Sequence, residues 1–373
     1  IPVQYTRKQI FEFAESELLA IENELKAPGS NEYGRVDRVA GWFLLARMYL
    51  NAQTWINENK YQEAYAYAVK VIADGHYPLA SDYREIFLAD NNTCKEIIWP
   101  LVQDGLRAQS SAGTNFYVKA FVNGPMDELY KTGVGSRGWG NVRAKVSLVD
   151  AFDADDVMFD GNDTWGNNKK DKRAQFMTAL PNQVKDTWDV NMDMTSTFTC
   201  GYGYIKWRNV TKEDELCPSG DAYTSIDFPL FRTADAYLMA AEAILRGANG
   251  TQSEALGYVN EVRTRAYMSG KYAKNGVRSD VSGEITANEL NLDFLLVERQ
   301  KELASELTRR TDLIRFGKYT KGNNWDWKNG VRLGADVDDK YNLFPIPESE
   351  LTNNPTLVQN DGYKAVSYTH LTL

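Results

Sequence analysis

Three glutamates on one face of a predicted helix are the residues best placed to carry out chemistry. Glu298, Glu302 and Glu306 stand at every fourth position of the stretch FLLVERQKELASELTRRTDLIRFGKY, residues 294–319. Paired carboxylates are the groups that an acid/base active site uses. Carboxylates four residues apart also repel each other on an isolated helix, so they need cations from the same or another element. The sequence offers such cations at Arg299, Arg309, Arg310 and Arg315 nearby, and at Arg232, Arg263 and Arg265 upstream. We favour an ion-paired structural helix, because structural ion-pair networks imitate catalytic clusters.

Other catalytic arrangements find little support. The chain has two histidines, His76 and His370, which leaves almost no room for a Ser-His-Asp or Cys-His arrangement. It has no glycine-rich phosphate loop and no H-E-x-x-H motif. Its three cysteines, Cys94, Cys200 and Cys217, are too far apart in the sequence for a zinc site. Cys200 and Cys217 flank one loop-rich segment, and both a disulfide and unpaired thiols remain open.

An acidic segment over residues 150–173 is the best metal candidate. Calcium takes six to eight oxygen ligands, and this segment offers Asp153, Asp155 and Asp160 among others. No register of the segment satisfies the EF-hand template, so we favour a solvated acidic loop. We expect no cofactor, with calcium as the open alternative.

Aromatic residues in polar loops are the best candidates for ligand binding. Phe, Tyr and Trp make up 12% of the chain, and several stand among Gly, Asn and Asp rather than in helical stripes. Such rings can stack on the apolar faces of sugars, while neighbouring polar side chains bind the hydroxyl groups; anchoring the loops is the alternative role. The candidates are the rings Trp139, Trp165, Trp188, Tyr202 and Tyr204, and the hydroxyl-binding side chains Arg137, Asn162 and Asn167.

Composition narrows the class of protein. The 373 residues carry a net charge of −9 and no Lys/Arg tract, so nucleic acid is not an expected partner. No run of 18 apolar residues predicts a transmembrane helix, and residues 1–4 do not begin a signal peptide.

Helical periodicity predicts the scaffold that must position these residues. An amphipathic helix is predicted over 6–25, with Thr6 and Gln9 as a capping box and a buried face from Phe11 to Leu25. Residues 36–73 and 229–267 each predict a pair of antiparallel helices similar to a tetratricopeptide unit. Between them, residues 100–228 are rich in Gly, Asn, Asp and aromatics, with a short helix at 145–153 and short strands within 196–209.

Several separated motifs together resemble one family, the SusD/RagB-like glycan-binding lipoproteins of Bacteroidetes. The helix matches E-R-x-x-E-x-x-x-E-x-x-R-x-x-D-x-x-R from Glu298 to Arg315, and Pro345-Ile346-Pro347 follows in the expected order. The end of the signature matches Asn354-Pro355, Leu357, Gln359-Asn360 and Gly362-Tyr363. The resemblance also implies that Asp171-Lys172-Arg173 is a structural Asp-x-Arg, and that Trp207, in a Lys-aromatic pair with Lys206, serves packing.

The resemblance implies a mainly α, tetratricopeptide-like scaffold with a large loop-rich insertion that contains short strands. It implies one domain over 1–363, with the scaffold in 1–99 and 229–363, the insertion in 100–228, and an unassigned tail at 364–373. The implied function is non-catalytic binding of a glycan and its delivery to a TonB-dependent, SusC-like outer-membrane transporter. The implied location is the outer-membrane surface, through a lipid anchor that we expect to precede this chain.

Two other classes of function remain as alternatives. A glycoside hydrolase on a helical frame would release reducing sugars, and a tetratricopeptide-type adaptor would bind protein peptides in a helical groove. The sequence does not name the sugar, although the acidic net charge makes a strongly anionic glycan less favoured.

Overall fold

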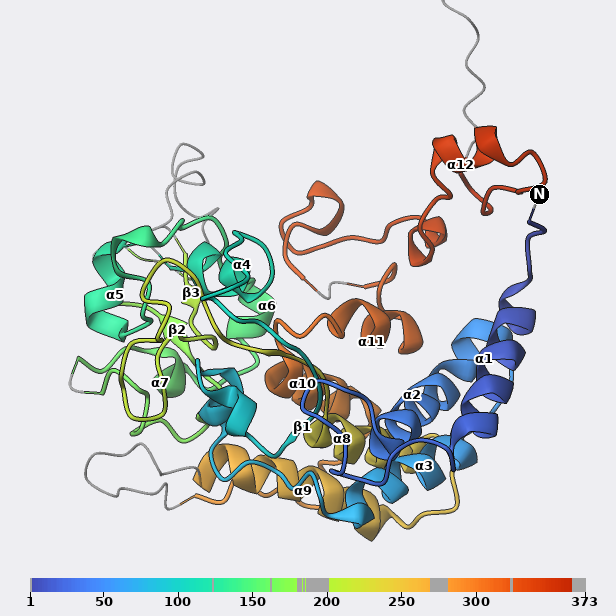
Figure 1. Ribbon diagram of the computed structural model, residues 1–373, viewed down its shortest axis with the longest axis horizontal. Coiled ribbons are helices and arrows are strands. Elements are labelled where there is room, and N and C mark those ends of the chain that lie inside the picture. The colour runs from blue at the N-terminus through green and yellow to red at the C-terminus, as the bar shows by residue number, and fades with distance from the viewer. Residues whose placement is uncertain are drawn as a thin grey trace, which may run out of the picture.

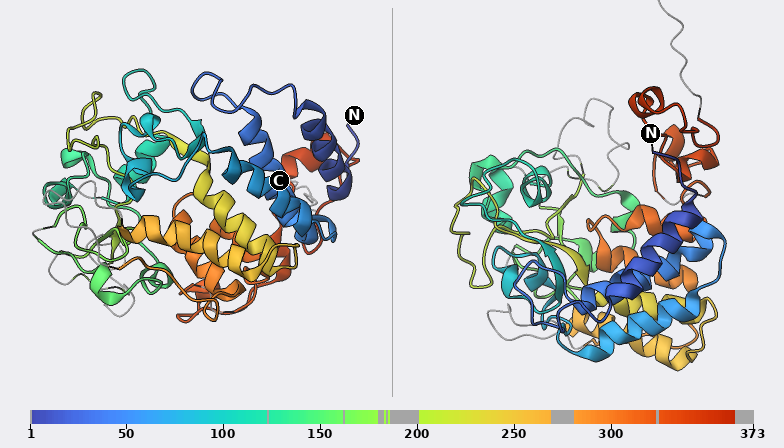
Figure 2. Two further views of the ribbon diagram at one scale, coloured as in Figure 1. Left: turned by 90° about the horizontal axis from the view of Figure 1, so that it is seen from below. Right: turned by 45° about the vertical axis from the view of Figure 1, so that its right-hand side comes forward.

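The computed structural model describes residues 2–122, 124–161, 163–179, 183, 185, 201–268, 281–322 and 325–363. The longer helices gather on one side of the molecule, and the loop-rich insertion with its short helices, coloured green to yellow-green, lies on the other (Figures 1 and 2). The predicted mainly α class is therefore confirmed. None of these helices is both long and apolar enough to cross a bilayer, within the residues described.

The helical scaffold is built from the two ends of the chain. Its helices are α1 (Arg7–Ile21), α2 (Arg38–Ile56), α3 (Tyr61–Asp74), α8 (Thr233–Leu245), α9 (Gln252–Met268), α10 (Leu292–Leu303), α11 (Arg309–Arg315) and α12 (Glu348–Asn353).

Local sequence signals set the bounds of the first helix pair. The Asp37 side chain caps α2 by accepting hydrogen bonds from the backbone N–H groups of Val39 and Ala40. The helix ends at Asn57, and α3 ends at Gly75, both in the left-handed conformation that favours Asn and Gly. The predicted helix pair over 36–73 is thus confirmed.

The two predicted helix pairs stack directly on each other. Helix α8 packs against α3 on one side and α9 on the other, so residues far apart in the sequence form one layer of helices. Nearly every residue of α8 is buried, and its alanines let neighbouring helices approach closely; Ala234, Ala236, Ala240, Ala241 and Ala243 are all fully buried. Tertiary structure therefore joins what the sequence separates.

The insertion leaves and re-enters the scaffold through one antiparallel ladder. Strand β1 (Ile97–Leu101) pairs with β4 (Phe228–Arg232), with Leu101 opposite Phe228 and Ile97 opposite Arg232. Between them lie α4 (Thr114–Ala120), α5 (Gly124–Tyr130), α6 (Val146–Val149), α7 (Ala154–Val157), β2 (Phe176–Met177) and β3 (Gly203–Tyr204). The predicted short helix near 145–153 is α6. Of the predicted strands, β3 is formed, and residues 196–200 lie outside the described part.

The insertion has an aromatic core of its own. Trp207 is fully buried and stacks on Phe228, with ring centroids 5.5 Å apart. Phe87 makes an edge-to-face contact with the Trp207 ring. The packing role predicted for Trp207 is confirmed.

Helix α1 is shorter and more exposed than predicted. The capping box of Thr6 and Gln9 is present, but the helix ends at Ile21 rather than near residue 25. Phe11 is its one buried residue, whereas Ile21 is exposed. The predicted apolar face is confirmed in part: Ala14 and Leu18 are half-buried against the scaffold core, where α1 packs along α2.

The C-terminal signature folds back on itself beside the N-terminus (Figure 1). The Gln359 side-chain amide accepts a hydrogen bond from the N–H of Ile346 and donates one to its carbonyl. The Tyr363 hydroxyl donates to the carbonyl of Leu343. Arg310 links this segment to α11 by donating to the carbonyls of Tyr341 and Asn342. These hydrogen bonds hold the C-terminal segment in its folded-back conformation.

Candidate functional site

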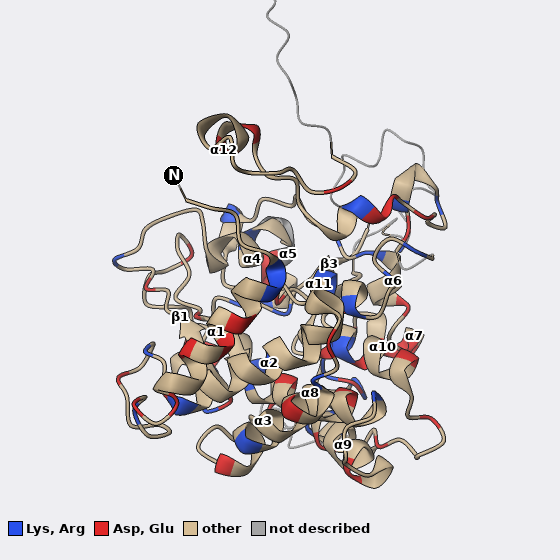
Figure 3. Ribbon diagram, turned by 90° about the vertical axis from the view of Figure 1, so that its right-hand side faces the viewer, with Lys and Arg blue, Asp and Glu red and all other residues tan. Residues whose placement is uncertain are grey.

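The three glutamates predicted to need cations lie in a buried ion-pair network. Glu298 Oε1 lies 2.7 Å from Arg173 Nη1, and its other oxygen pairs with Arg263. Glu302 is fully buried, with Arg232 Nη1 at 2.6 Å from its Oε1. The acidic and basic segments lie side by side where α8, α10 and α11 meet (Figure 3). The ion-paired structural helix is therefore confirmed.

Cations from the insertion complete this network. Glu306 pairs with Lys206 and with Arg232 at the end of β4, and Arg173 also reaches Glu302 at 3.1 Å. Arg173 is held bidentately by Asp171, with Nε and Oδ1 2.8 Å apart. The structural role implied for Asp171-Lys172-Arg173 is confirmed, because this motif clamps the insertion to α10.

The network is unsuited to acid catalysis. Burial acts to raise the pKa of the Glu302 carboxyl, but Arg265, Arg232 and Arg173 outweigh burial and hold that pKa well below its ordinary value. A carboxyl that stays ionised through the neutral range cannot donate a proton to a leaving group. Glu302 therefore holds the fold together instead of acting as a general acid.

A second buried network fastens α10 and α11 to α8. Arg299 donates to Asp235 at 2.8 Å and to Asp312 at 3.0 Å, and Arg315 holds both oxygens of Glu242. Arg309 and Arg310, the nearby cations in the sequence, donate hydrogen bonds to neutral oxygens instead. Charges within the scaffold are thus largely satisfied by the scaffold itself.

Two aromatic rings in the insertion form an exposed pair. Phe116 on α4 is 46% exposed and Trp139 is 38% exposed, and their ring centroids are 6.3 Å apart. The neighbouring Tyr117 turns inward against Trp207. We call Phe116 and Trp139 the aromatic ledge.

Backbone hydrogen bonds mount the ledge rigidly. The Trp139 N–H donates to the carbonyl of Lys119 at 2.8 Å, and the next two N–H groups donate to Val122 and Ala120. The loop that carries Trp139 is therefore tied to the end of α4, which carries Phe116. The predicted hydroxyl-binding residue Arg137 stands two positions before Trp139 in the sequence. Its Nε donates to Asp221 at 3.0 Å on the surface.

Trp165 and Asn167 have structural surroundings. The Trp165 ring is 5% exposed and lies under the Arg208 guanidinium, 4.4 Å from its centroid, next to Leu88. The Asn167 side-chain oxygen accepts a hydrogen bond from Arg84 at 2.7 Å. A ring so enclosed offers no face to a ligand, which corrects our expectation for Trp165 in favour of the loop-anchoring alternative.

The predicted tyrosines lie apart from the ledge. Tyr202 packs half-buried against the core around Phe176, and Tyr204 is 1% exposed. Tyr204 nevertheless contributes to the wall of a cavity between the insertion and α10. Trp188 and Asn162 lie outside the described residues, as does Cys200 and with it the question of a disulfide to Cys217.

The acidic segment uses its buried carboxylates to order its own loop. Asp156 accepts hydrogen bonds from the N–H groups of Lys170 and Asp171, whereas Asp153, Asp155 and Asp160 are exposed. Within the described part of the chain, no three acidic, His or Cys side chains gather as a metal site. Calcium remains an untested expectation.

Sequence reasoning missed Phe116. It stands in the short segment TNFYVKA, where neither periodicity nor neighbouring glycines mark it. Its exposure is decided by the Trp139 loop, which covers one side of α4. Phe116 would have been found if aromatic residues in the short helices of the insertion had been considered together with those in its loops.

Fold and site together define a tetratricopeptide-like helical scaffold that holds a loop-rich insertion bearing exposed aromatic rings. Residues 95–363 match the model of the SusD family, and the chain belongs to this family. It is 32% identical to the starch-binding protein SusD of Bacteroides thetaiotaomicron over 98% of its length. It is also 25% identical, over 88% of its length, to a SusD-like protein of Formosa agariphila.

A solved structure shares the fold. Surface glycan-binding protein A from Bacteroides thetaiotaomicron, in complex with laminarihexaose, superposes with a TM-score of 0.64 at 21% identity and covers 96% of this chain. The present chain covers 72% of that structure, 67% of SusD and 59% of the Formosa agariphila protein. It therefore spans about two thirds of the length of these relatives.

Proposed function

We propose that this chain is a non-catalytic glycan-binding protein that captures oligosaccharide on the aromatic ledge. The observation that carries the proposal is the exposed pair of Phe116 and Trp139, mounted on α4 by backbone hydrogen bonds. Membership of the SusD family supports it, since a relative is named for binding starch and another was solved with laminarihexaose.

Stacking accounts for the choice of these rings. The carbon-bound hydrogens of a pyranose form an apolar face, which gains by covering an aromatic face and leaving water. Two tilted rings 6.3 Å apart make a bent surface that suits a curved oligosaccharide better than a flat one. The Arg137–Asp221 pair supplies both a donor and an acceptor for sugar hydroxyls.

Binding without catalysis fits the placement of the carboxylates. The strongest carboxylate cluster is buried under arginines, away from the ledge, and holds the insertion onto α10. No observation favours the hydrolase or the peptide-binding adaptor over this proposal.

The proposal includes a location and a partner, both drawn from the family. The full protein would sit on the outer-membrane surface through a lipid anchor. There it would deliver the captured glycan to a TonB-dependent, SusC-like transporter. Stacking with a few surface hydrogen bonds gives weak, reversible capture, which suits a protein that must release its ligand.

Isothermal titration calorimetry with maltoheptaose and with laminarihexaose tests the binding, alongside an assay for new reducing ends. We expect at least one probe to bind, without turnover. Trp139→Ala and Phe116→Ala should each weaken binding about tenfold, the effect of losing one aromatic contact. Phe13→Ala is the matched control, because Phe13 is exposed on α1 in the scaffold.

Three outcomes would count against the proposal. Absence of binding to both probes would refute glycan capture by this chain, and release of reducing ends would refute its non-catalytic character. Equal loss of affinity in Phe13→Ala and Phe116→Ala would show that the ledge is not the site.

A further inference from the structure

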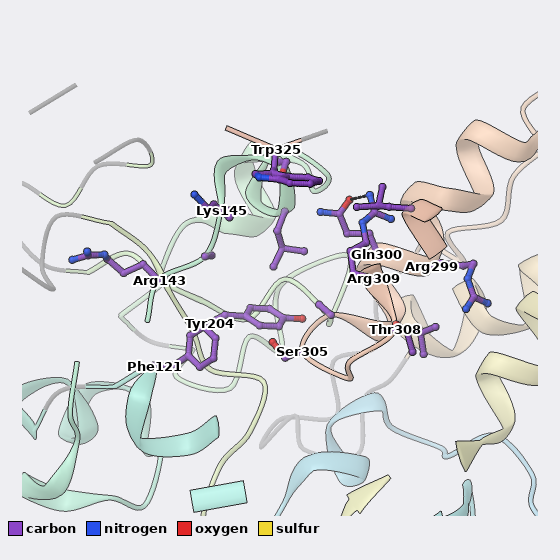
Figure 4. A pocket seen from close by; sticks show the side chains of 16 residues that line it. Phe121, Arg143, Lys145, Tyr204, Arg299, Gln300, Ser305, Thr308, Arg309 and Trp325 are labelled. Carbon is purple, nitrogen blue, oxygen red and sulfur yellow. Dashed lines mark hydrogen bonds between the residues drawn. The ribbon is translucent and has the colours of Figure 1, made fainter. Parts of the chain in front are cut away.

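A cavity of about 290 Å³ lies between the insertion and the helical scaffold. Phe121 at the end of α4 and Tyr204 of β3 line it from the insertion, and Gln300 of α10 and Arg309 of α11 line it from the scaffold. In Figure 4, Trp325 lies above the cavity, and Gln300 and Arg309 lie together on one side, across from Tyr204. Its volume is at the small end of the roughly 300–1,000 Å³ of ligand pockets, so it suits one sugar unit rather than a chain.

The charge of this cavity is opposite to that of the chain. Arg143, Lys145, Arg299 and Arg309 line it, and no Asp or Glu does among the described residues. The chain as a whole carries −9. Carboxylates outside the cavity pair with some of these cations: Arg299 pairs with Asp235 and Asp312, and Lys145 lies 3.8 Å from Asp326.

Arg309 hydrogen-bonds neutral oxygens, and Asp312, which already pairs with Arg299 and Arg315, acts on it from beyond ion-pair distance. Its Nη1 donates to the Leu296 carbonyl and its Nη2 to the Gln300 side-chain oxygen, each at 2.7 Å. Both partners are neutral, and no ion pair to Arg309 is formed among the described residues. Burial lowers the pKa of its guanidinium to about 10, so the group remains charged at neutral pH. A half-buried guanidinium held in place without an ion pair is prepared to bind an anion.

The remaining walls suit a sugar ring. Trp325, Phe121 and Leu148 offer apolar surface, and Ser305, Thr308 and Gln300 offer hydrogen-bonding groups. Ser305 holds its backbone at φ +62°, a left-handed conformation that a serine rarely adopts. Such local strain is tolerated where the surroundings fix it, and binding sites are a common place for it.

We propose that this cavity binds a single anionic sugar unit, with its carboxylate or sulfate on Arg309. The sugar part rests on the proposed function, whereas the anionic part rests on the cavity alone. The cavity is lined by neither Phe116 nor Trp139, although Phe121, which lines it, directly follows α4. The acidic net charge of the chain, which disfavours anionic glycans, is thus locally reversed.

Titration by NMR with D-glucuronate, D-glucose and D-glucose 6-sulfate tests the proposal. We expect at least one of the charged sugars to bind about tenfold tighter than glucose, as one charge-assisted, bidentate contact provides. The preference should shrink as NaCl is raised. Comparison of the two charged sugars tells carboxylate from sulfate.

Variants locate the effect. Arg309→Gln should remove the preference for the charged sugar, and Arg309→Lys should retain part of it. Arg310→Gln is the matched control, because Arg310 neighbours Arg309 but does not line the cavity. Melting temperatures of all variants check that loss of binding is not loss of folding. Trp139→Ala should leave the preference intact.

Equal binding of glucose and both charged sugars would overturn the proposal. So would an equal loss in Arg309→Gln and Arg310→Gln, or loss of the preference in Trp139→Ala, which would move the anion to the ledge. If no neutral oligosaccharide binds while the charged sugar still depends on Arg309, the proposed function fails and the anion site stands.

Discussion

The guanidinium of Arg173 lies 2.7 Å from the carboxylate of Glu298, although 125 residues separate them in the sequence. Both side chains are buried, one in the loop-rich insertion and the other on α10. This contact joins the part of the molecule that carries the ledge to the part that resembles a helical repeat. The loops that we propose to bind glycan are therefore held by charge as well as by apolar packing.

Replacement of Arg173 should loosen the insertion. Arg173→Met leaves Asp171, Glu298 and Glu302 short of one buried cation, and breaking a buried pair costs about 3–5 kcal/mol. Hydrogen exchange should quicken in residues 201–210 more than in α2 and α3. Arg137→Met is the matched control, since its ion pair is on the surface and contributes about 0–1 kcal/mol. Equal exchange in the two variants would contradict the clamp.

Stability should fall in acid because buried carboxylates must take up protons. Arginine charges outweigh burial and depress the pKa of Glu302 and of Asp235 in the folded protein. Their contribution is fully present above the ordinary values of 4.5 and 3.8, and it is lost as the pH falls toward the folded values. Urea unfolding should therefore show a free energy that declines below about pH 4.5.

Two variants assign that acid dependence. Glu302→Gln should be less stable at pH 7 and should lose less stability than the parent between pH 5 and pH 3. The reason is that the variant takes up one proton fewer when it unfolds in this pH range. Glu213→Gln, at an exposed loop position, should follow the parent. An unchanged acid profile in Glu302→Gln would remove Glu302 from the explanation.

Two tryptophans of the insertion should lose very different amounts of stability on truncation. Trp165→Ala removes a buried ring under Arg208 and should lower the free energy of unfolding by about 3–5 kcal/mol. Trp139→Ala removes a ring that is 38% exposed and should cost about 1 kcal/mol or less. Urea denaturation at pH 7 measures both. A larger loss for Trp139 would place that ring in the core and weaken the case for the ledge.

Cys94 should resist alkylation in the folded protein. Burial raises the pKa of its thiol to about 12, so almost no thiolate exists at pH 8. Peptide-resolved mass spectrometry after iodoacetamide treatment should find Cys94 and the buried Cys217 labelled only after unfolding. Ser30→Cys, at an exposed position, supplies the positive control. Rapid native labelling of Cys94 would show that its surroundings open readily.

The sequence by itself determined the helical scaffold and the family signature. Helical periodicity, the capping box of Thr6 and Gln9, and the repeat of Glu298, Glu302 and Glu306 depend on residues a few positions apart, and such local patterns survive without knowledge of the fold. The need for cations followed in the same way, since carboxylates at that spacing repel each other.

Tertiary structure alone decided which groups meet and which rings reach the surface. Arg173 and Lys206 neutralise the glutamates from far upstream, and Phe116 pairs with Trp139 because a loop is tied onto α4. Trp165 and Trp139 have similar Gly- and Asn-rich neighbours, yet one is buried and the other exposed. The physical reason is that exposure in a loop depends on what packs over it, and that partner is set by the chain folding back, not by the neighbouring residues.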